Sequence, residues 1–233
     1  MKKIILASTS TLFGEEYLEY PMEELAVFFK DVMVITFIPY ARPGGISHDD
    51  YTELVANAFS KIDKKVVGLH TFSNPTEAIN QAEAIYTGGG NTFLLVHQLY
   101  RSDLMQPLKE KIIGGTPYLG TSAGSNICGV TMMNTNDMPI VYPPSFNTLG
   151  FIPFNINAHY LDPIDGSTHM GETRATRIKE YHAYNSITVL GLREGSWLQV
   201  SGASITLKGK LTARVFKQDQ EPYEIESGSE VAL

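Results

Sequence analysis

The feature that most limits the fold of this chain is the alternation, through its first half, of short apolar runs with longer segments of helical period. The runs are rich in β-branched residues. Their continuous apolar character is typical of strands buried on both faces, as in a parallel sheet. They predict five strands, at residues 3–8, 32–39, 65–70, 83–88 and 116–121.

The segments between these runs carry apolar residues at helical spacing. They predict helices at residues 15–30, with a start or kink near Pro21, and at 47–62, 76–82, 92–101 and 103–113. Ser47, with Asp50 three residues later, resembles a capping box at the start of the second helix. This β-α-β-α order predicts an α/β fold with a doubly wound, mostly parallel central sheet flanked by helices. Ligands of such sheets bind at the carboxyl ends of the strands.

The pattern changes after Asp137, where the apolar runs become shorter. They predict extra strands, several of them antiparallel, at residues 138–142, 154–160, 186–192, 196–209 and 213–217. One helix is predicted among them, at residues 172–184. Because no internal repeat, low-complexity tract or linker divides the chain, we expect residues 1–233 to form a single domain.

Composition limits the class of protein and its partners. The 233 residues are 43% hydrophobic and 18% charged, as in a globular protein with a substantial core. The formal net charge of −7 argues against nucleic acid or an anionic membrane as the main partner, because both bind basic faces. No run reaches the roughly 7–15 residues of a signal-peptide core at the N-terminus, or the roughly 18 of a membrane span. We therefore expect a cytoplasmic protein. A homodimer is compatible with the sequence.

Cysteine and histidine spacing gives no sign of a metal. Cys128 is the only cysteine, so an intramolecular disulfide and a cysteine-based zinc cluster are both excluded. The histidines form neither an H-E-x-x-H nor an H-x-H pattern. We expect neither a metal nor another cofactor. A helical position for Cys128 indicates ordinary packing.

The sharpest local motif is Gly120-Thr121-Ser122-Ala123-Gly124, which lies between a predicted strand and a helix. A G-x-S-x-G pattern in this context predicts a nucleophile elbow, a strained turn that exposes a serine hydroxyl. The turn also directs the backbone N–H of Ala123 toward a developing oxyanion. The alternative is a close-packed strand–helix junction, in which the two glycines only relieve crowding.

A second glycine-rich stretch, Thr87 to Thr92, also follows a predicted strand and opens a helix. Three consecutive glycines indicate that the backbone approaches another group closely. The loop could donate a second N–H to the oxyanion site of Ser122, or bind a phosphate at the helix N-terminus. It lacks the Lys-[Ser/Thr] of a phosphate-binding Walker loop. A plain turn is the remaining interpretation.

A catalytic serine needs a base and an acid that orients it. His159 ends an apolar run flanked by asparagines, a setting that suits a histidine presented from a strand end. Asp137 and Glu194 each lie beside a predicted strand end, and either could be the acid. Arg193, next to Glu194, indicates a local ion pair. His48, His97 and His182 are predicted to be at the surface or structural. His169 lies in a polar loop, and His70, which ends a predicted strand, could face the cleft, although contact with solvent is favoured.

Taken together, these motifs resemble peptidase E, the α-aspartyl dipeptidase family of serine peptidases. This family belongs to the fold group of the class I glutamine amidotransferases, with cyanophycinase as a relative. The matching stretches run in the family's order over about four-fifths of the chain. They are FIPYA from Phe37, GGGNTF from Gly88, GTSAGSN from Gly120, NTNDMPIV from Asn134, INAHY from Ile156, GETR from Gly171 and GLREGSW from Gly191.

The resemblance implies roles for individual residues. Ser122 takes the nucleophile position, His159 the base, and Gly90 and Ala123 the oxyanion donors. The third catalytic member is Asp137 or Glu194; we favour Glu194, since the related amidotransferases use the order nucleophile, His, Glu. Asp137 then remains an acid close to the site.

The implied substrate is a small peptide, a dipeptide with an N-terminal L-aspartate. A cation must then bind the aspartate side chain. Arg174 is our candidate and Arg177 the second choice, with a pair between Arg174 and Glu172 as the structural alternative. Two other functions stay open: a cyanophycinase-like activity on β-aspartyl peptides, and a non-catalytic binding protein for a small ligand.

The sequence departs from the common family pattern at three positions. Thr121 stands where a bulky aromatic is frequent, Ser125 where alanine is usual, and Ala158 where proline often precedes the histidine. None of these changes removes a catalytic group. Thr121 and Ser125 bear on the shape of the pocket.

Overall fold

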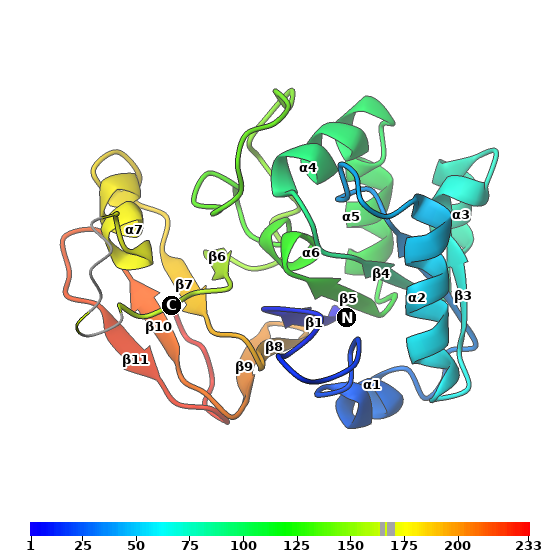
Figure 1. Cartoon of the computed structure of the whole chain (residues 1–233), viewed down its shortest axis with the longest axis horizontal. Coiled ribbons are helices and arrows are strands. Elements are labelled where there is room, and N and C mark those ends of the chain that lie inside the picture. The colour runs from blue at the N-terminus through cyan, green and yellow to red at the C-terminus, as the bar shows by residue number, and fades with distance from the viewer. Residues whose placement is uncertain (164–165, 167–170) are drawn as a thin grey trace.

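The computed structural model describes residues 1–163, 166 and 171–233, and its strands form two sheets. The larger sheet contains β1 Lys3–Ala7, β2 Val34–Ile38, β3 Lys65–Gly68, β4 Ala84–Thr87, β5 Tyr118–Thr121, β8 Ser196–Ser201 and β9 Ser204–Gly209. The smaller sheet contains β6 Asn155–Ala158, β7 Val189–Leu192, β10 Ala213–Phe216 and β11 Tyr223–Ile225. Figure 1 shows the two sheets next to each other, with the smaller one at the left.

The larger sheet has the order β3-β2-β4-β5-β1-β8-β9. Its first five strands pair in parallel, and β8 and β9 form an antiparallel hairpin at the edge beside β1. The five strands predicted in the first half of the sequence are therefore confirmed. Each is shorter than predicted; β3 ends at Gly68 because a 3-10 turn, Leu69–Thr71, follows it.

Helices cover both faces of this sheet, as predicted for a doubly wound fold. Their bounds are α1 Met22–Phe28, α2 His48–Ser60, α3 Pro75–Gln81, α4 Thr92–Arg101, α5 Met105–Ile113 and α6 Ala123–Asn126, with α7 Arg174–His182 beside the smaller sheet. One apolar cluster joins α1 and α2 to Ile5, and another joins α3, α4 and α5 to Ile4 and Leu6. Neighbouring residues of one strand therefore face different helical layers.

Local signals fixed several helix boundaries. Ser47 caps α2, with its hydroxyl oxygen accepting from Asp50 N–H at 3.0 Å. The helix predicted at 15–30 begins only at Met22, directly after Pro21, because the preceding residues form turns. α4 has the predicted bounds, and α7 is two residues shorter than predicted at each end.

The second half contains one wrong prediction and one omission. Residues 138–142 form no strand. Met138 and Tyr142 are 74% and 87% exposed, and Pro139 and Pro143 flank an apolar run that packs against no sheet. The missed strand is β11, which has only three residues and pairs only with β10.

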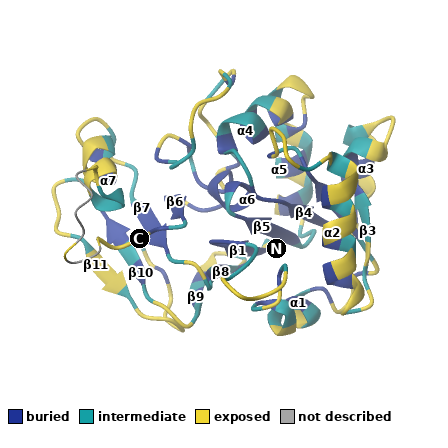
Figure 2. Ribbon diagram, viewed as in Figure 1, coloured by how far each residue is buried: buried dark blue, intermediate teal, exposed yellow. Residues whose placement is uncertain are grey.

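The two sheets share one core. The cluster that contains Ile4 and Leu6 also contains Ile156, Leu190 and Val215 from the smaller sheet. Figure 2 shows most strands of both sheets as buried, whereas β11 and the outer helices and loops carry many exposed residues. That residues 1–233 form a single domain remains a prediction from the sequence. No helix in the described part of the chain is long and apolar enough to cross a membrane.

Candidate active site

Ser122 lies in the turn between β5 and α6, and its backbone is strained. Its φ of 53° and ψ of −112° are a rare combination for a non-glycine residue, which costs on the order of 1–3 kcal/mol. Both flanking glycines are required by close packing. A Cβ on Gly120 would lie 2.4 Å from the carbonyl oxygen of Gly124, and one on Gly124 would lie 2.1 Å from that of Thr87. The turn has the geometry of a nucleophile elbow.

His159 and Glu194 come from the smaller sheet. β6 and β7 pair in parallel with Ala158 opposite Leu192, so the residues that follow the two strands emerge at the same edge. Ser8, just after β1, connects this edge to the larger sheet. Its hydroxyl donates to the carbonyl of Leu192 at 2.7 Å and accepts from the backbone N–H of His159 at 2.9 Å.

These three side chains form a continuous hydrogen-bonded relay. His159 Nε2 lies 2.9 Å from Ser122 Oγ, and His159 Nδ1 lies 2.6 Å from Glu194 Oε1. The imidazole is 38% exposed and the Glu194 side chain 45% exposed. A nucleophile, a base and an orienting carboxylate thus have the spacing of a catalytic triad, in a site open to solvent.

The glycine loop after β4 lies directly against the serine. A Cβ on Gly89 would be 3.0 Å from Ser122 Cβ and 3.6 Å from Ser122 Oγ. Gly90 has a φ of 146°, and a Cβ there would lie 2.3 Å from the carbonyl oxygen of Ala41. The loop therefore needs glycine at both positions to approach the nucleophile this closely.

Asp137 is adjacent to this loop but does not contact the histidine. Its Oδ2 accepts from the backbone N–H of Thr92 at 2.7 Å, at the N-terminus of α4. The hydroxyl of Thr135 donates to the same oxygen at 3.1 Å. Of the two acids that the sequence left open, the structure brings Glu194 to His159 and uses Asp137 as a helix cap.

Comparison with known proteins identifies the family of the chain. The model of "Peptidase family S51" matches residues 4–208. The chain belongs to this family. A relative named "Peptidase E" from Streptomyces coelicolor is 44% identical over 229 residues, covering 98% of this chain and 93% of the relative. A "Probable alpha-aspartyl dipeptidase" from Drosophila melanogaster is also 44% identical, over 221 residues, covering 94% and 91%.

Solved structures show the same fold. The crystal structure of a peptidase from an acI-B1 actinobacterium superimposes with a TM-score of 0.75, at 16% identity, covering all of this chain and 97% of the other. The S51 chain described here therefore keeps the fold of that structure at low sequence identity. The resemblance inferred from the motifs is confirmed.

Arg174, the candidate for substrate recognition, is the first residue of α7 and is half-buried. Burial lowers its pKa below the ordinary value, the charge of Arg177 lowers it further, and the charge of Asp137 raises it. Arg174 thus lies within electrostatic reach of the helix cap beside the glycine loop. The pair with Glu172 is made by Arg177 instead, at 3.7 Å.

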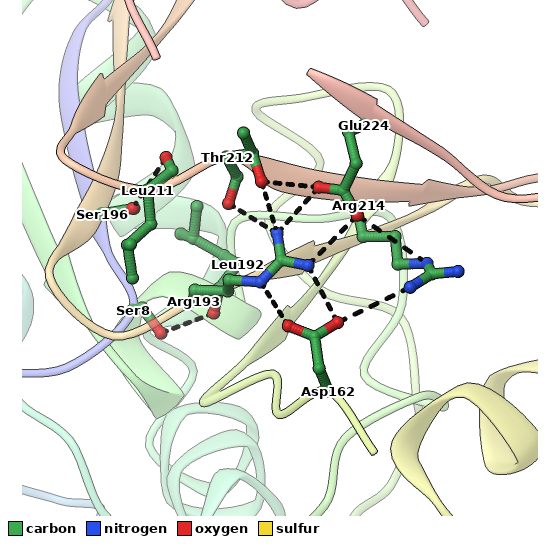
Figure 3. Close-up of polar contacts among 9 residues, drawn as sticks. All are labelled: Ser8, Asp162, Leu192, Arg193, Ser196, Leu211, Thr212, Arg214 and Glu224. Carbon is green, nitrogen blue, oxygen red and sulfur yellow. Dashed lines mark hydrogen bonds and ion pairs between the residues drawn. The ribbon is translucent and has the colours of Figure 1, made fainter. Parts of the chain in front are cut away.

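Arg193 directly precedes Glu194 in the sequence, and Figure 3 shows the polar contacts of its side chain. Its guanidinium binds Asp162 through Nε and Nη2 at 2.7 and 2.9 Å, and Glu224 through Nη1 and Nη2 at 2.8 and 3.1 Å. Nη1 also donates to the Thr212 carbonyl at 2.8 Å. Because Asp162 follows His159 by three residues, Arg193 connects the segments of both triad partners. The ion pair that the sequence indicated exists, but not with Glu194.

A cavity of about 650 Å³ lies on one side of Glu194 and is also lined by Tyr20, Trp197 and Leu211. Burial raises the pKa of Tyr20 above its ordinary value, and the nearby negative charges of Glu194 and Glu15 raise it further. The Tyr20 hydroxyl donates to the carbonyl of Thr9 at 2.7 Å. Tyr20 therefore remains protonated beside Glu194.

The remaining histidines are outside the site or outside the described residues. His70 pairs with Asp49 at the surface, His97 Nδ1 contacts the Tyr142 carbonyl, and His182 Nδ1 contacts the Asn185 carbonyl. The His48 ring packs at a tilt against Tyr40 and edge-on against His70. His169 lies among the residues that the structure does not describe.

Sequence reasoning missed Ser8 and the buried tyrosines beneath the glycine loop. Ser8 stands at the carboxyl end of β1, where ligand-contacting residues of such a sheet are expected, and this position was the available signal. In the sequence, Tyr51 and Tyr86 occupy positions typical of apolar core residues in a helix and a strand. No local pattern distinguishes them from core residues.

Proposed function

We propose that this protein is a serine dipeptidase that hydrolyses dipeptides with an N-terminal L-aspartate through an acyl-enzyme on Ser122. The observation that carries the proposal is the relay from Ser122 Oγ through His159 to Glu194, built on a strained turn. Membership of family S51 and similarity to proteins named peptidase E and alpha-aspartyl dipeptidase support the substrate class.

The relay accounts for acylation and deacylation. Ser122 Oγ attacks the carbonyl of the scissile bond, and its proton passes to His159 Nε2. Glu194 accepts from His159 Nδ1, which holds the tautomer needed for attack and stabilises the imidazolium that forms. His159 then protonates the leaving amine, and a water activated by the same imidazole releases aspartate from the serine.

The tetrahedral oxyanion is bound by the backbone N–H groups of Ala123 and Gly90. Ala123 is the first residue of α6, so its N–H has no partner within the helix. Gly90 belongs to the loop that packs against Ser122. Each donor contributes on the order of 2.7–4 kcal/mol to stabilisation of the transition state.

Arg174 is the group that we propose recognises the aspartate side chain. A guanidinium binds a carboxylate through two parallel hydrogen bonds, which favours aspartate over the neutral asparagine. Its position at the start of α7, within reach of the Asp137 charge, supports this role. Arg174→Met should raise KM for Asp-X substrates and abolish the preference for Asp-X over Asn-X. Arg177→Met is the matched control, with that preference retained.

The proposal is tested with a panel of Asp-X, Glu-X, Asn-X and β-Asp-X dipeptides, together with a serine-directed fluorophosphonate. We expect Asp-X to be the preferred substrate and Ser122→Ala to lose both turnover and labelling. Preference for β-Asp-X would indicate a cyanophycinase-like activity. No turnover and no labelling of Ser122 would indicate a binding protein.

The location and assembly of the enzyme are part of the same proposal. We propose a cytoplasmic enzyme that needs no cofactor and acts on small peptides. Its single thiol, Cys128, is buried and free, which requires no oxidising compartment. Size-exclusion chromatography with light scattering distinguishes a monomer from a homodimer, and neither result affects the triad, because all its members come from one chain.

A further inference from the structure

A chain of four hydroxyl groups lies beneath the nucleophile turn and the glycine loop. It starts at Thr121, the residue before the nucleophile, whose Oγ1 lies 3.0 Å from the Tyr86 hydroxyl. Tyr86 lies 2.5 Å from the Tyr17 hydroxyl, and Tyr17 lies 3.2 Å from that of Tyr51. Tyr51 donates to the carbonyl oxygen of Gly89 at 3.3 Å. Thr121, Tyr86 and Tyr51 are fully buried.

The carbonyl oxygen at the end of this chain of hydroxyl groups determines which hydroxyl is the donor in each hydrogen bond. Each hydroxyl has one proton to donate, and a carbonyl oxygen only accepts. Since Tyr51 donates to Gly89, the proton between Tyr17 and Tyr51 comes from Tyr17. By the same reasoning Tyr86 donates to Tyr17, and Thr121 donates to Tyr86. Every hydrogen bond in the chain of hydroxyl groups is therefore donated in the direction from Thr121 to the Gly89 carbonyl. Hydrogen bonds connected in this way strengthen one another.

The Gly89 carbonyl belongs to the same peptide unit as the N–H of Gly90. That unit is planar and trans, so its N–H points away from its C=O. A peptide between two glycines rotates with little steric resistance, because neither residue has a Cβ. A hydrogen bond to the Gly89 oxygen therefore determines where the Gly90 N–H points.

The Tyr51 ring is itself held in place. It packs edge-on against Phe37 with ring centroids 4.9 Å apart, and the Arg42 guanidinium lies 4.9 Å from its centroid. The glycine loop also leaves space for the hydroxyl, since a Cβ on Gly88 would lie 2.5 Å from Tyr51 Oη. Few other orientations are open to this hydroxyl.

We propose that Tyr51 is a positioning residue, which orients the Gly89–Gly90 peptide so that the Gly90 N–H meets the oxyanion. This inference rests on the proposed function, in which Gly90 is an oxyanion donor. Thr121, which stands where an aromatic residue is frequent in the family, donates the first hydrogen bond in the chain of hydroxyl groups.

The test compares Tyr51→Phe with Tyr17→Phe. Each variant removes one buried hydroxyl and leaves one donor and one acceptor of the chain without a partner, so their effects on stability should match. Only Tyr51→Phe releases the Gly89 carbonyl. We expect Tyr51→Phe to lower kcat for Asp-X about fivefold to tenfold, with KM unchanged, as for the loss of one hydrogen bond. Tyr17→Phe should retain kcat within about twofold, because Tyr51 still donates to Gly89.

A second readout does not depend on the substrate. A fluorophosphonate forms a tetrahedral adduct on Ser122, with fluoride leaving and an oxygen occupying the oxyanion site. Its labelling rate should fall in Tyr51→Phe by about the same factor as kcat and remain unchanged in Tyr17→Phe. Equal effects of the two variants, or no effect of Tyr51→Phe, would overturn the proposal. Absence of Asp-X turnover in the wild type, with labelling intact, would reject the substrate assignment and leave this comparison valid.

Discussion

The seven-stranded sheet holds Ser122 in one strained turn, whereas the four-stranded sheet brings His159 and Glu194 together by pairing two strands that are far apart in the sequence. In the larger sheet, Ser122 lies in a strained turn between two glycines that have no room for a Cβ, and this close packing fixes the position of the serine. On the side of the smaller sheet, charged groups on separate loops are joined by Arg193. The nucleophile is therefore a local property of the chain, and the base and its acid depend on long-range pairing. This difference can be tested at several points.

The largest expected effect separates the two acids. Glu194→Gln should lower kcat by roughly 10²–10⁴-fold with little change in KM, because an amide cannot stabilise the imidazolium as a carboxylate does. Asp137→Asn should lower kcat less than about tenfold, because Asp137 caps α4 and does not contact His159. Steady-state kinetics on an Asp-X substrate measure both. A larger loss of kcat in Asp137→Asn than in Glu194→Gln would indicate that Asp137 is the acid that acts with His159.

The next effect concerns how the smaller sheet positions its turn. Arg193→Met should cost about 2–3 kcal/mol of unfolding free energy and about tenfold in kcat, since it removes the nearer of the two cations that Asp162 and Glu224 share. Arg214→Met is the matched control. Its pairs with the same acids are 3.6 and 3.9 Å long, so the expected cost is under about 1 kcal/mol, with kcat unchanged. Equal losses in the two variants would contradict the role of Arg193.

A smaller effect addresses the strained turn itself. Ser122→Gly should be about 1 kcal/mol more stable than Ser122→Ala, because glycine adopts a positive φ without strain. Both variants lack the nucleophile, so activity does not enter the comparison. Urea unfolding followed by circular dichroism gives the two free energies. If alanine were equally stable, the turn would not store strain.

The smallest effect is a dependence of stability on pH. Hydrogen bonds from Arg193 lower the pKa values of Asp162 and Glu224 below the ordinary 3.8 and 4.5. Their contribution is complete above those unfolded values and is lost as pH falls through the lower folded ones. We expect the Tm to fall more steeply below about pH 4.5 in the wild type than in Arg193→Met. Parallel curves for the two proteins would exclude a contribution from this cluster.

Much of the fold was predictable because its signals are local. Continuous apolar runs located β1 to β5, and α4 was predicted to the residue because Asn91 and Arg101 bound a clear apolar period. The 138–142 strand failed because apolar content alone does not provide a partner strand. β11 was missed because its pairing with β10 depends on tertiary context.

The sequence alone predicted the serine of the candidate site better than it predicted the histidine and the acid. The G-x-S-x-G pattern and its context pointed to Ser122 from the sequence alone. His159 and the choice between Asp137 and Glu194 could not be derived in this way, because their relation depends on the register of β6 against β7. Only the family resemblance connected them. The chain of hydroxyl groups that ends at Gly89 could not be predicted from the sequence either, because it joins residues from four separate segments.

The position of β1 between β5 and β8 has a consequence for synthesis on the ribosome. β1 precedes the other described strands of its sheet in the sequence, yet one of its two edges receives its partner only when Ser196–Ser201 emerges. Until then the nascent chain presents an unpaired strand edge that is apolar from Ile4 to Ala7, which other chains can join. Glu194 emerges only two residues before β8 begins. Glu194, the residue that contacts His159, is therefore synthesised just before the strand that covers the edge of β1.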